Sequence, residues 1–262
     1  AARGEPSALP AFRWHVVSPD GRPPQAMGGL GLSVAGALAQ VPKPDLIFIP
    51  GLHFTGDMKH FARQVDALAE SCGDWLSEQY RNGAVLAASC AGVFLLAEAG
   101  LLDGRKATTS WWLGGMLRAS YPCVCLCEGE LVTRDGRILS SGAFTACLDL
   151  ALRSVEYFVG PAVALSCAKV MLIDATRDSQ FPYMTLQAKL QHGDDLVLRA
   201  QSRIRSGVRQ DISIESLASE LGVSTRTLNR RFHEALGCTP THYLQEVRVD
   251  GAKRLLETTG FS

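Results

Sequence analysis

The sequence predicts a two-domain protein, in which a domain of alternating strands and helices precedes a smaller all-helical domain. Through about residue 175, apolar runs of strand length alternate with stretches of helical periodicity, as in a mainly parallel sheet covered by helices. From residue 196 only the helical periodicity continues. The length of 262 residues fits two domains. We place them at 1–177 and 196–262, with a linker at 178–195.

The strands of the first domain are predicted from short apolar runs. Residues 45–50 and 84–89 are almost wholly apolar, which indicates buried strands of a parallel sheet. An earlier strand is expected at 13–18, directly before the turn residues Pro-Asp-Gly. Residues 123–133 and 137–140 are expected to form a hairpin with an Asp-Gly pair at its turn.

Helices of the first domain are predicted at 61–80, 93–99 and 143–159. The second and third stop at Gly100 and Gly160, because glycine readily adopts the left-handed conformation that ends a helix.

The second domain contains a predicted helix-turn-helix after a first helix at 196–206. Gly222 stands where one helix must stop and the chain must turn, and Ser224 is placed to cap the next helix. The alternative is a plain helical hairpin whose basic residues are only solvated. Apolar residues at helical spacing support both helices: Leu217, Ala218, Leu221, Leu228 and Phe232.

The outward face of the second of these helices carries side chains suited to DNA. The formal net charge of the chain is zero, so composition alone does not indicate a nucleic-acid ligand. Residues 224–233, however, hold three arginines and no acid. Arginine can bond guanine, and asparagine adenine, through two hydrogen bonds each. The candidate DNA-binding residues are Thr225, Arg226, Thr227, Asn229, Arg230 and Arg231.

These candidates divide by the part of DNA that they are expected to contact. We expect Arg226, Asn229 and Arg230 to reach base edges, and Thr225 and Arg231 to contact phosphates.

Cys90 is the most distinctive position of the first domain. It directly follows the apolar run 84–89 and precedes Ala91 and Gly92, the small residues that a sharp strand-to-helix turn needs. Open α/β sheets bind ligands at this carboxyl end of their strands. From position alone, a ligand-facing thiol and a packed, inert cysteine are equally supported.

The chain has eight cysteines. No secretion signal precedes them, so we expect reduced thiols. Cys123, Cys125 and Cys127 alternate and would share one face of a strand. We expect that face to be buried and not a metal site, because no histidine lies nearby in the sequence. No apolar run approaches the ~20 residues that cross a membrane.

The segment 237–259 resembles the AraC/XylS family of transcription regulators. That family carries two helix-turn-helices in tandem, so the resemblance implies a truncated DNA-binding domain, since the second is absent here. The matching Gly-x-x-Pro-x-x-Tyr and Arg-x-x-x-Ala-x-x-Leu-Leu patterns lie at Gly237, Pro240, Tyr243, Arg248, Ala252, Leu255 and Leu256.

The segment 90–112 resembles the GlxA-type regulators, which join a ThiJ/PfpI-like domain to a C-terminal AraC-type domain. Further matches lie at 50–51, 121–122, 140–142 and 149–150. The resemblance implies a flavodoxin-like parallel-sheet sandwich, the class I glutamine amidotransferase-like fold, for the first domain. It also implies a bacterial cytoplasmic regulator that binds double-stranded DNA, forms a homodimer and senses a small-molecule effector, with no cofactor and no metal.

Two departures from the resemblance affect the expected chemistry. Enzymes of this superfamily carry Thr-Thr-His where this chain has Thr108, Thr109 and Ser110. Serine cannot act as a base near neutral pH, so no catalytic residue is expected. His53 and His60 are expected to be ordinary surface residues. The superfamily's first strand, with its acidic partner for the cysteine, has no counterpart, and no acidic partner is assigned.

Three functions follow from Cys90 in this setting. The first is a non-catalytic sensing or dimerisation domain. The second is a thiol-dependent hydrolase, hydratase or glyoxalase-like enzyme with an appended helical module, and the third is a redox sensor. The expected ligand pocket comprises Gly51, Leu52, His53, Cys90, Ala91, Ser110 and Trp111.

Overall fold

The computed structural model describes residues 12–24, 29–41, 43–54, 56–184, 192–207 and 212–259. The chain divides into two compact units. The α/β unit consists of Ala1–Ser110 and Leu117–Asp178, and the helical unit of Trp111–Met116 and Ser179–Ser262.

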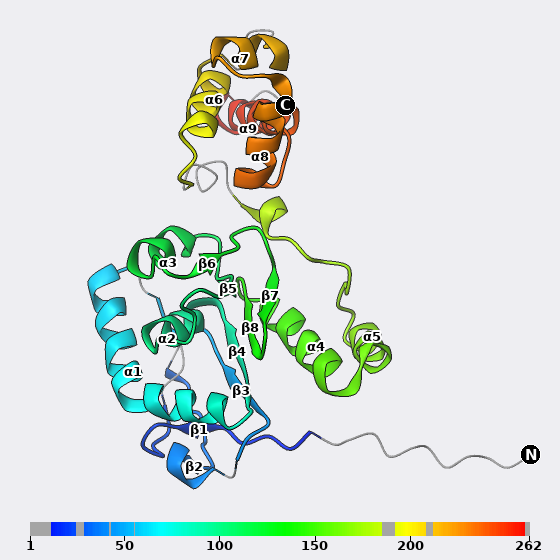
Figure 1. The fold of residues 1–262 in the computed structure, drawn as a ribbon. Helices are drawn as coiled ribbons and strands as arrows, with labels where there is room; N and C mark the ends of the chain where they lie inside the picture. The colour runs from blue at the N-terminus through cyan, green and yellow to red at the C-terminus, as the bar shows by residue number, and fades with distance from the viewer. Residues whose placement is uncertain are drawn as a thin grey trace, which may run out of the picture. The chain divides into compact units, whose positions relative to one another are not determined.

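A four-stranded sheet forms the centre of the α/β unit, with the strand order β3-β4-β8-β7 (Figure 1). Neighbouring strands β3, β4 and β8 are parallel, and β7 runs antiparallel to β8. Central strand β4 is buried along its whole length. The predicted mainly parallel sheet is therefore confirmed. The strands are β3 (Leu46–Ile49), β4 (Val85–Ser89), β7 (Val132–Asp135) and β8 (Ile138–Ser141).

Helices cover both faces of this sheet, with α1 and α2 on one side and α4 and α5 on the other (Figure 1). Their bounds are α1 (Met58–Arg81), α2 (Val93–Glu98), α4 (Ala146–Val159) and α5 (Pro161–Val170). The three predicted helices are confirmed. The sequence reasoning missed α5, in which Pro161 starts a new helix directly after Gly160 has ended α4.

The start of α1 shows how local sequence sets a helix boundary. The Asp57 carboxylate accepts hydrogen bonds from the backbone N–H groups of Lys59 and His60, at 2.9 and 3.1 Å. The bond from His60 contributes most to lowering the pKa of Asp57. Phe61 and Val65, four residues apart, then face the core.

Two predicted strands differ in the structure. The strand expected at 13–18 is reduced to β1 (Val17–Ser18), which pairs with β2 (Gly36–Ala37) in a separate two-stranded sheet. The run 123–133 is not one strand either. Its first part, β6 (Cys125–Leu126), pairs with β5 (Lys106–Ala107), and the hairpin is formed by β7 and β8 around Gly136.

The prediction of a buried cysteine face is wrong. Cys123 and Cys125 are exposed and Cys127 is partly buried, whereas Val124 between them faces the core. The reason is that β6 is only two residues long, so no strand places the three thiols in register. Desolvation raises the pKa of the Cys127 thiol. All eight cysteines lie among the described residues and are reduced.

Four helices pack around one core in the helical unit. They are α6 (Asp195–Ser206), α7 (Ile214–Glu220), α8 (Thr225–Leu236) and α9 (Pro240–Thr259). Leu228 and Phe232 of α8 have no exposed surface, as their four-residue spacing predicted. Of the linker expected at 178–195, residues 185–191 lie outside the described part of the chain.

A shorter helix, α3 (Gly114–Ser120), follows the two tryptophans that begin at residue 111. Among the residues that the structure describes, no helix is both long enough and apolar enough to span a membrane.

Candidate DNA-binding helix and Cys90 elbow

Tight local interactions join α7 to α8. Gly222 turns the chain after α7 with a left-handed φ of +71°. The Ser224 hydroxyl then accepts a hydrogen bond from the backbone N–H of Thr227, at 3.2 Å, and caps α8. Gly237 ends α8 in the left-handed conformation. These contacts form the helix-turn-helix that the sequence predicted.

Two arginines of α8 point into solvent. Arg226 and Arg230 are both exposed. The Nη1 atom of Arg230 lies 2.7 Å from Oε1 of Glu234, one helical turn away, in a pair whose side chains are 61% and 55% exposed. Such an exposed pair contributes little free energy, so Arg230 can exchange Glu234 for a DNA acceptor.

The other polar candidates on α8 are engaged within the protein. The Asn229 amide donates to the backbone oxygen of Thr225 at 2.9 Å, and the hydroxyls of Thr227 and Ser224 lie 2.9 Å apart. To read a base, Asn229 would have to rotate away from its own helix.

Arg231 forms an ion pair with Asp194, the residue that caps α6. Oδ1 of Asp194 accepts the Val197 backbone N–H at 3.1 Å, while its Oδ2 accepts from Nε of Arg231. The hydrogen bond from Arg231 lowers the pKa of Asp194, and the same bond raises the pKa of Arg231. The sequence reasoning missed this partner because it assigned Asp194 to the linker.

Cys90 lies at a strained turn at the end of β4. Its φ is +54°, a value that is costly for a residue with a side chain. The residues Cys90–Gly92 form a 3-10 turn that leads into α2. A Cβ at Gly92 would lie 2.3 Å from the carbonyl oxygen of Pro50, and one at Gly51 would lie 3.3 Å from the Cys90 Cβ. The elbow therefore requires glycine at position 92, whereas a Cβ at Gly51 would need only a small shift of Cys90.

Hydroxyl groups surround the elbow. Ser110 is fully buried, and its hydroxyl donates to Sγ of Cys90 at 2.8 Å. The Thr109 hydroxyl donates to the backbone oxygen of Cys90 at 2.8 Å. The structure thus brings Ser110 to the sulfur, at the position where the resemblance places a histidine in related enzymes.

A second group of buried hydroxyls lies along the same sheet and was not found from the sequence. Ser141 donates to Ser89 at 3.2 Å, and the Ser140 hydroxyl lies 2.6 Å from that of Thr133. These residues occupy paired positions of β4, β8 and β7, so only the strand register brings them together.

The remaining members of the expected ligand pocket differ in their exposure. Gly51 and His53 are exposed, Leu52 is half-buried, and Ala91 is buried. His60 is exposed as well, as expected for a surface histidine. Trp111 belongs to the helical unit, where its backbone N–H donates to the Gln180 side chain at 3.2 Å.

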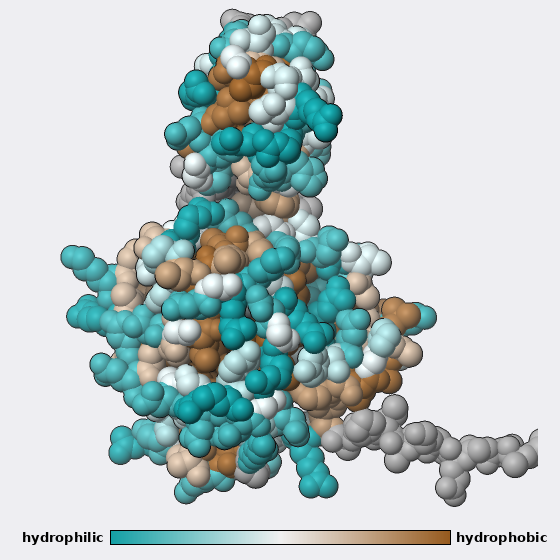
Figure 2. Space-filling model, viewed as in Figure 1, coloured by the Kyte–Doolittle hydropathy of each residue, from teal (hydrophilic) through white to brown (hydrophobic). Residues whose placement is uncertain are grey.

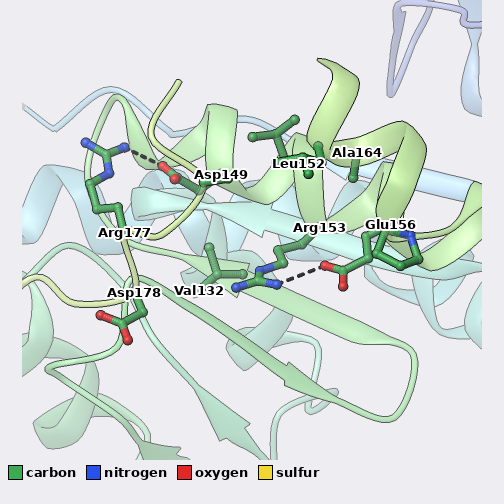
Figure 3. Close-up of a pocket in the computed structure, with 11 residues that line it drawn as sticks. Val132, Asp149, Leu152, Arg153, Glu156, Ala164, Arg177 and Asp178 are labelled. Carbon is green, nitrogen blue, oxygen red and sulfur yellow. Dashed lines mark hydrogen bonds and ion pairs between the residues drawn. The ribbon is translucent and has the colours of Figure 1, made fainter. Parts of the chain in front are cut away.

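A hollow of about 190 Å³ opens elsewhere on the α/β unit, between β7, α4, α5 and the segment 175–178 (Figure 3). Ion pairs join Asp149 to Arg177 and Arg153 to Glu156 across its wall. It shares no residue with the expected Cys90 pocket. The lining residues are Val132, Asp149, Leu152, Arg153, Glu156, Pro161, Ala164, Leu165, Ala175, Arg177 and Asp178.

The part of the chain that the structure describes contains no cluster of metal-ligating side chains. Within it, no three or more His, Cys, Asp or Glu side chains are grouped so that they could hold an ion.

The geometry of both units defines a class of protein: a flavodoxin-like α/β domain with a cysteine elbow, joined to a helix-turn-helix domain. Two family models match the chain in the same arrangement. Residues 10–157 match the DJ-1/PfpI family, and residues 217–262 match a helix-turn-helix domain.

Two known proteins are similar over more than half of the chain. The HTH-type transcriptional regulator CdhR of Pseudomonas aeruginosa is 30% identical over 253 residues, which cover 96% of this chain and 72% of CdhR. The isonitrile hydratase of Pseudomonas putida is 28% identical over 154 residues, covering 59% of this chain and 63% of the hydratase.

A solved structure supports the fold. The crystal structure of "a putative transcriptional regulator protein from Vibrio parahaemolyticus" superimposes with a TM-score of 0.52 at 21% identity, covering 60% of this chain and 78% of that one.

The chain belongs to the DJ-1/PfpI family. More specifically, it is a DNA-binding transcription regulator of the GlxA type, with an AraC-type helix-turn-helix following the α/β domain. Both the expected family and the expected fold class are confirmed.

Proposed function

We propose that this regulator reads a specific DNA sequence with α8, while its α/β unit senses a small molecule, forms a homodimer, or does both, without catalysing a reaction. The observation that carries the DNA part is the exposure of Arg226 and Arg230 on a helix fixed at both ends. Their guanidinium groups suit guanine in the major groove.

The observation that carries the non-catalytic part is the Ser110 hydroxyl, 2.8 Å from the Cys90 sulfur. A cysteine nucleophile that turns over needs a nearby base and proton donor, and a buried hydroxyl supplies no base near neutral pH. A polar, half-buried sulfur beside backbone groups can still bind an effector.

The DNA part is tested by selecting bound duplexes from a random pool and measuring affinities for the enriched sequence. Replacing Arg230 with alanine should cost ~1–3 kcal/mol on that sequence and relax preference at one position. Arg199→Ala is the matched control, because it removes the same charge from an exposed position on α6. An Arg230→Ala variant with unchanged sequence preference would remove Arg230 from the base-reading set.

The alternative is an enzyme that uses Cys90, and the left-handed elbow favours it, since thiol enzymes expose nucleophiles in this way. Purified protein would be assayed for isonitrile hydration, the activity named for the similar hydratase. We expect no turnover above that of Cys90→Ser. Turnover that disappears in Cys90→Ser would establish the enzyme and overturn the non-catalytic part.

A further inference from the structure

Asp194 connects the start of α6 to the DNA-binding helix α8. One carboxylate oxygen caps α6 and the other binds Arg231 of α8. The residue stands at the carboxyl end of the segment 178–195, directly before the first helix of the DNA-binding domain. The Asp194 side chain therefore links the start of α6 directly to α8.

The ion pair with Asp194 changes the charge that α8 presents. Residues 224–233 carry three arginines, and Asp194 neutralises one of them. The pair is only partly exposed, with 38% of the Arg231 side chain and 15% of the Asp194 side chain accessible. It is thus less screened than the exposed pair between Arg230 and Glu234.

We propose that Asp194 is a positioning residue that withholds Arg231 from DNA phosphates. The proposal rests on the proposed function, since it requires α8 to be the helix that faces DNA. It makes the Asp194 carboxylate a determinant of the affinity for DNA.

The two roles of Asp194 can be separated by one substitution. Asparagine caps helices as well as aspartate does, so Asp194→Asn retains the cap of α6 and removes the charge that holds Arg231. A freed Arg231 adds one phosphate contact. Each such contact makes the logarithm of the binding constant fall with the logarithm of salt concentration more steeply by about 0.9.

The experiment measures affinity of the full chain for the selected duplex between 50 and 200 mM salt. We expect Asp194→Asn to bind about three- to tenfold more tightly at 0.1 M salt, with a gain that shrinks about 3.5-fold across this range. In an Arg231→Gln background the same substitution should give no gain. Circular dichroism verifies that the helices of each variant are intact.

Asp195→Asn is the matched control for charge alone. Asp195 is the neighbouring exposed carboxylate on the first turn of α6. An equal gain in Asp194→Asn and Asp195→Asn would overturn the proposal, as would weaker binding by Asp194→Asn. Failure of the proposed function gives a different result, because Arg230→Ala would then leave affinity unchanged.

Discussion

Gly92→Ala should damage the Cys90 elbow by steric contact alone. Gly92 has ordinary helical angles, with φ of −62° and ψ of −21°, so alanine meets no conformational strain there. The added Cβ would lie 2.3 Å from the Pro50 carbonyl oxygen and 3.1 Å from Cγ2 of Ile49. Relieving the first contact requires β3 and the elbow to separate by about 1 Å.

Two opposing effects set the change in the free energy of unfolding that Gly92→Ala causes. Overpacking of a buried site costs ~1–3 kcal/mol, while replacing glycine with alanine in a helical conformation returns ~0.4–1 kcal/mol by restricting the unfolded chain. Because the obstacle is backbone and cannot rotate away, we expect a net loss near ~2 kcal/mol. Gly73→Ala in α1 is the matched control, because its Cβ would make only ordinary contacts, 3.5 Å from the Ala99 Cβ. That variant should equal or exceed the wild type in stability.

The assay is urea-induced unfolding followed by tryptophan fluorescence, in which Trp75 of α1 reports on the α/β unit. If Gly92→Ala unfolds at the same urea concentration as the wild type, the steric contact with Pro50 is not destabilising, and the elbow tolerates a side chain at this position.

Three further predictions concern the core, the ion pair and the thiols. Phe232→Ala should lower the free energy of unfolding of the helical unit by ~3–5 kcal/mol and abolish DNA binding, because this ring is fully buried and packs edge-to-face on Tyr243. A melting temperature within a few degrees of the wild-type value would contradict this prediction. The lowered pKa of Asp194 stabilises the fold above its unfolded pKa of ~3.9, and this contribution is lost as pH falls through the lower folded value; acid titration by circular dichroism should therefore show a weaker pH dependence for Asp194→Asn in that acid range. In a thiol titration at neutral pH the exposed Cys123 and Cys125 should react first and Cys72 last, since burial raises the Cys72 pKa; early labelling of Cys72 would refute the order.

The sequence contained enough to predict elements with strong local signals. The buried strand at 84–89 is apolar up to Ser89, and the cap at Ser224 and the turn at Gly222 are chemically specific, so both elements were predicted correctly. The placement of Ser110 beside Cys90 also followed, but only from a resemblance to a family.

Contacts between segments that lie far apart in the sequence could not be predicted. The pairing of Asp194 with Arg231 joins residues on different helices, and the register of β7 on β8 alone brings Thr133 to Ser140. The cysteine prediction failed for the opposite reason. Alternation along 123–127 assumed a long strand, yet hydrogen bonding to β5 ends after two residues.

The order of strands in the central sheet has a consequence for how the chain folds. Strand β4 lies between β3 and β8, and Leu86 pairs with Ile138, a residue far along the sequence. The sheet of the α/β unit therefore cannot close during synthesis until the segment through Ser141 has left the ribosome. Until then the apolar β4 edge is open to other chains, which is the state most vulnerable to aggregation. The contacts of the helical unit span a shorter stretch of chain, since its core is formed by α6 to α9 between Asp195 and Thr259.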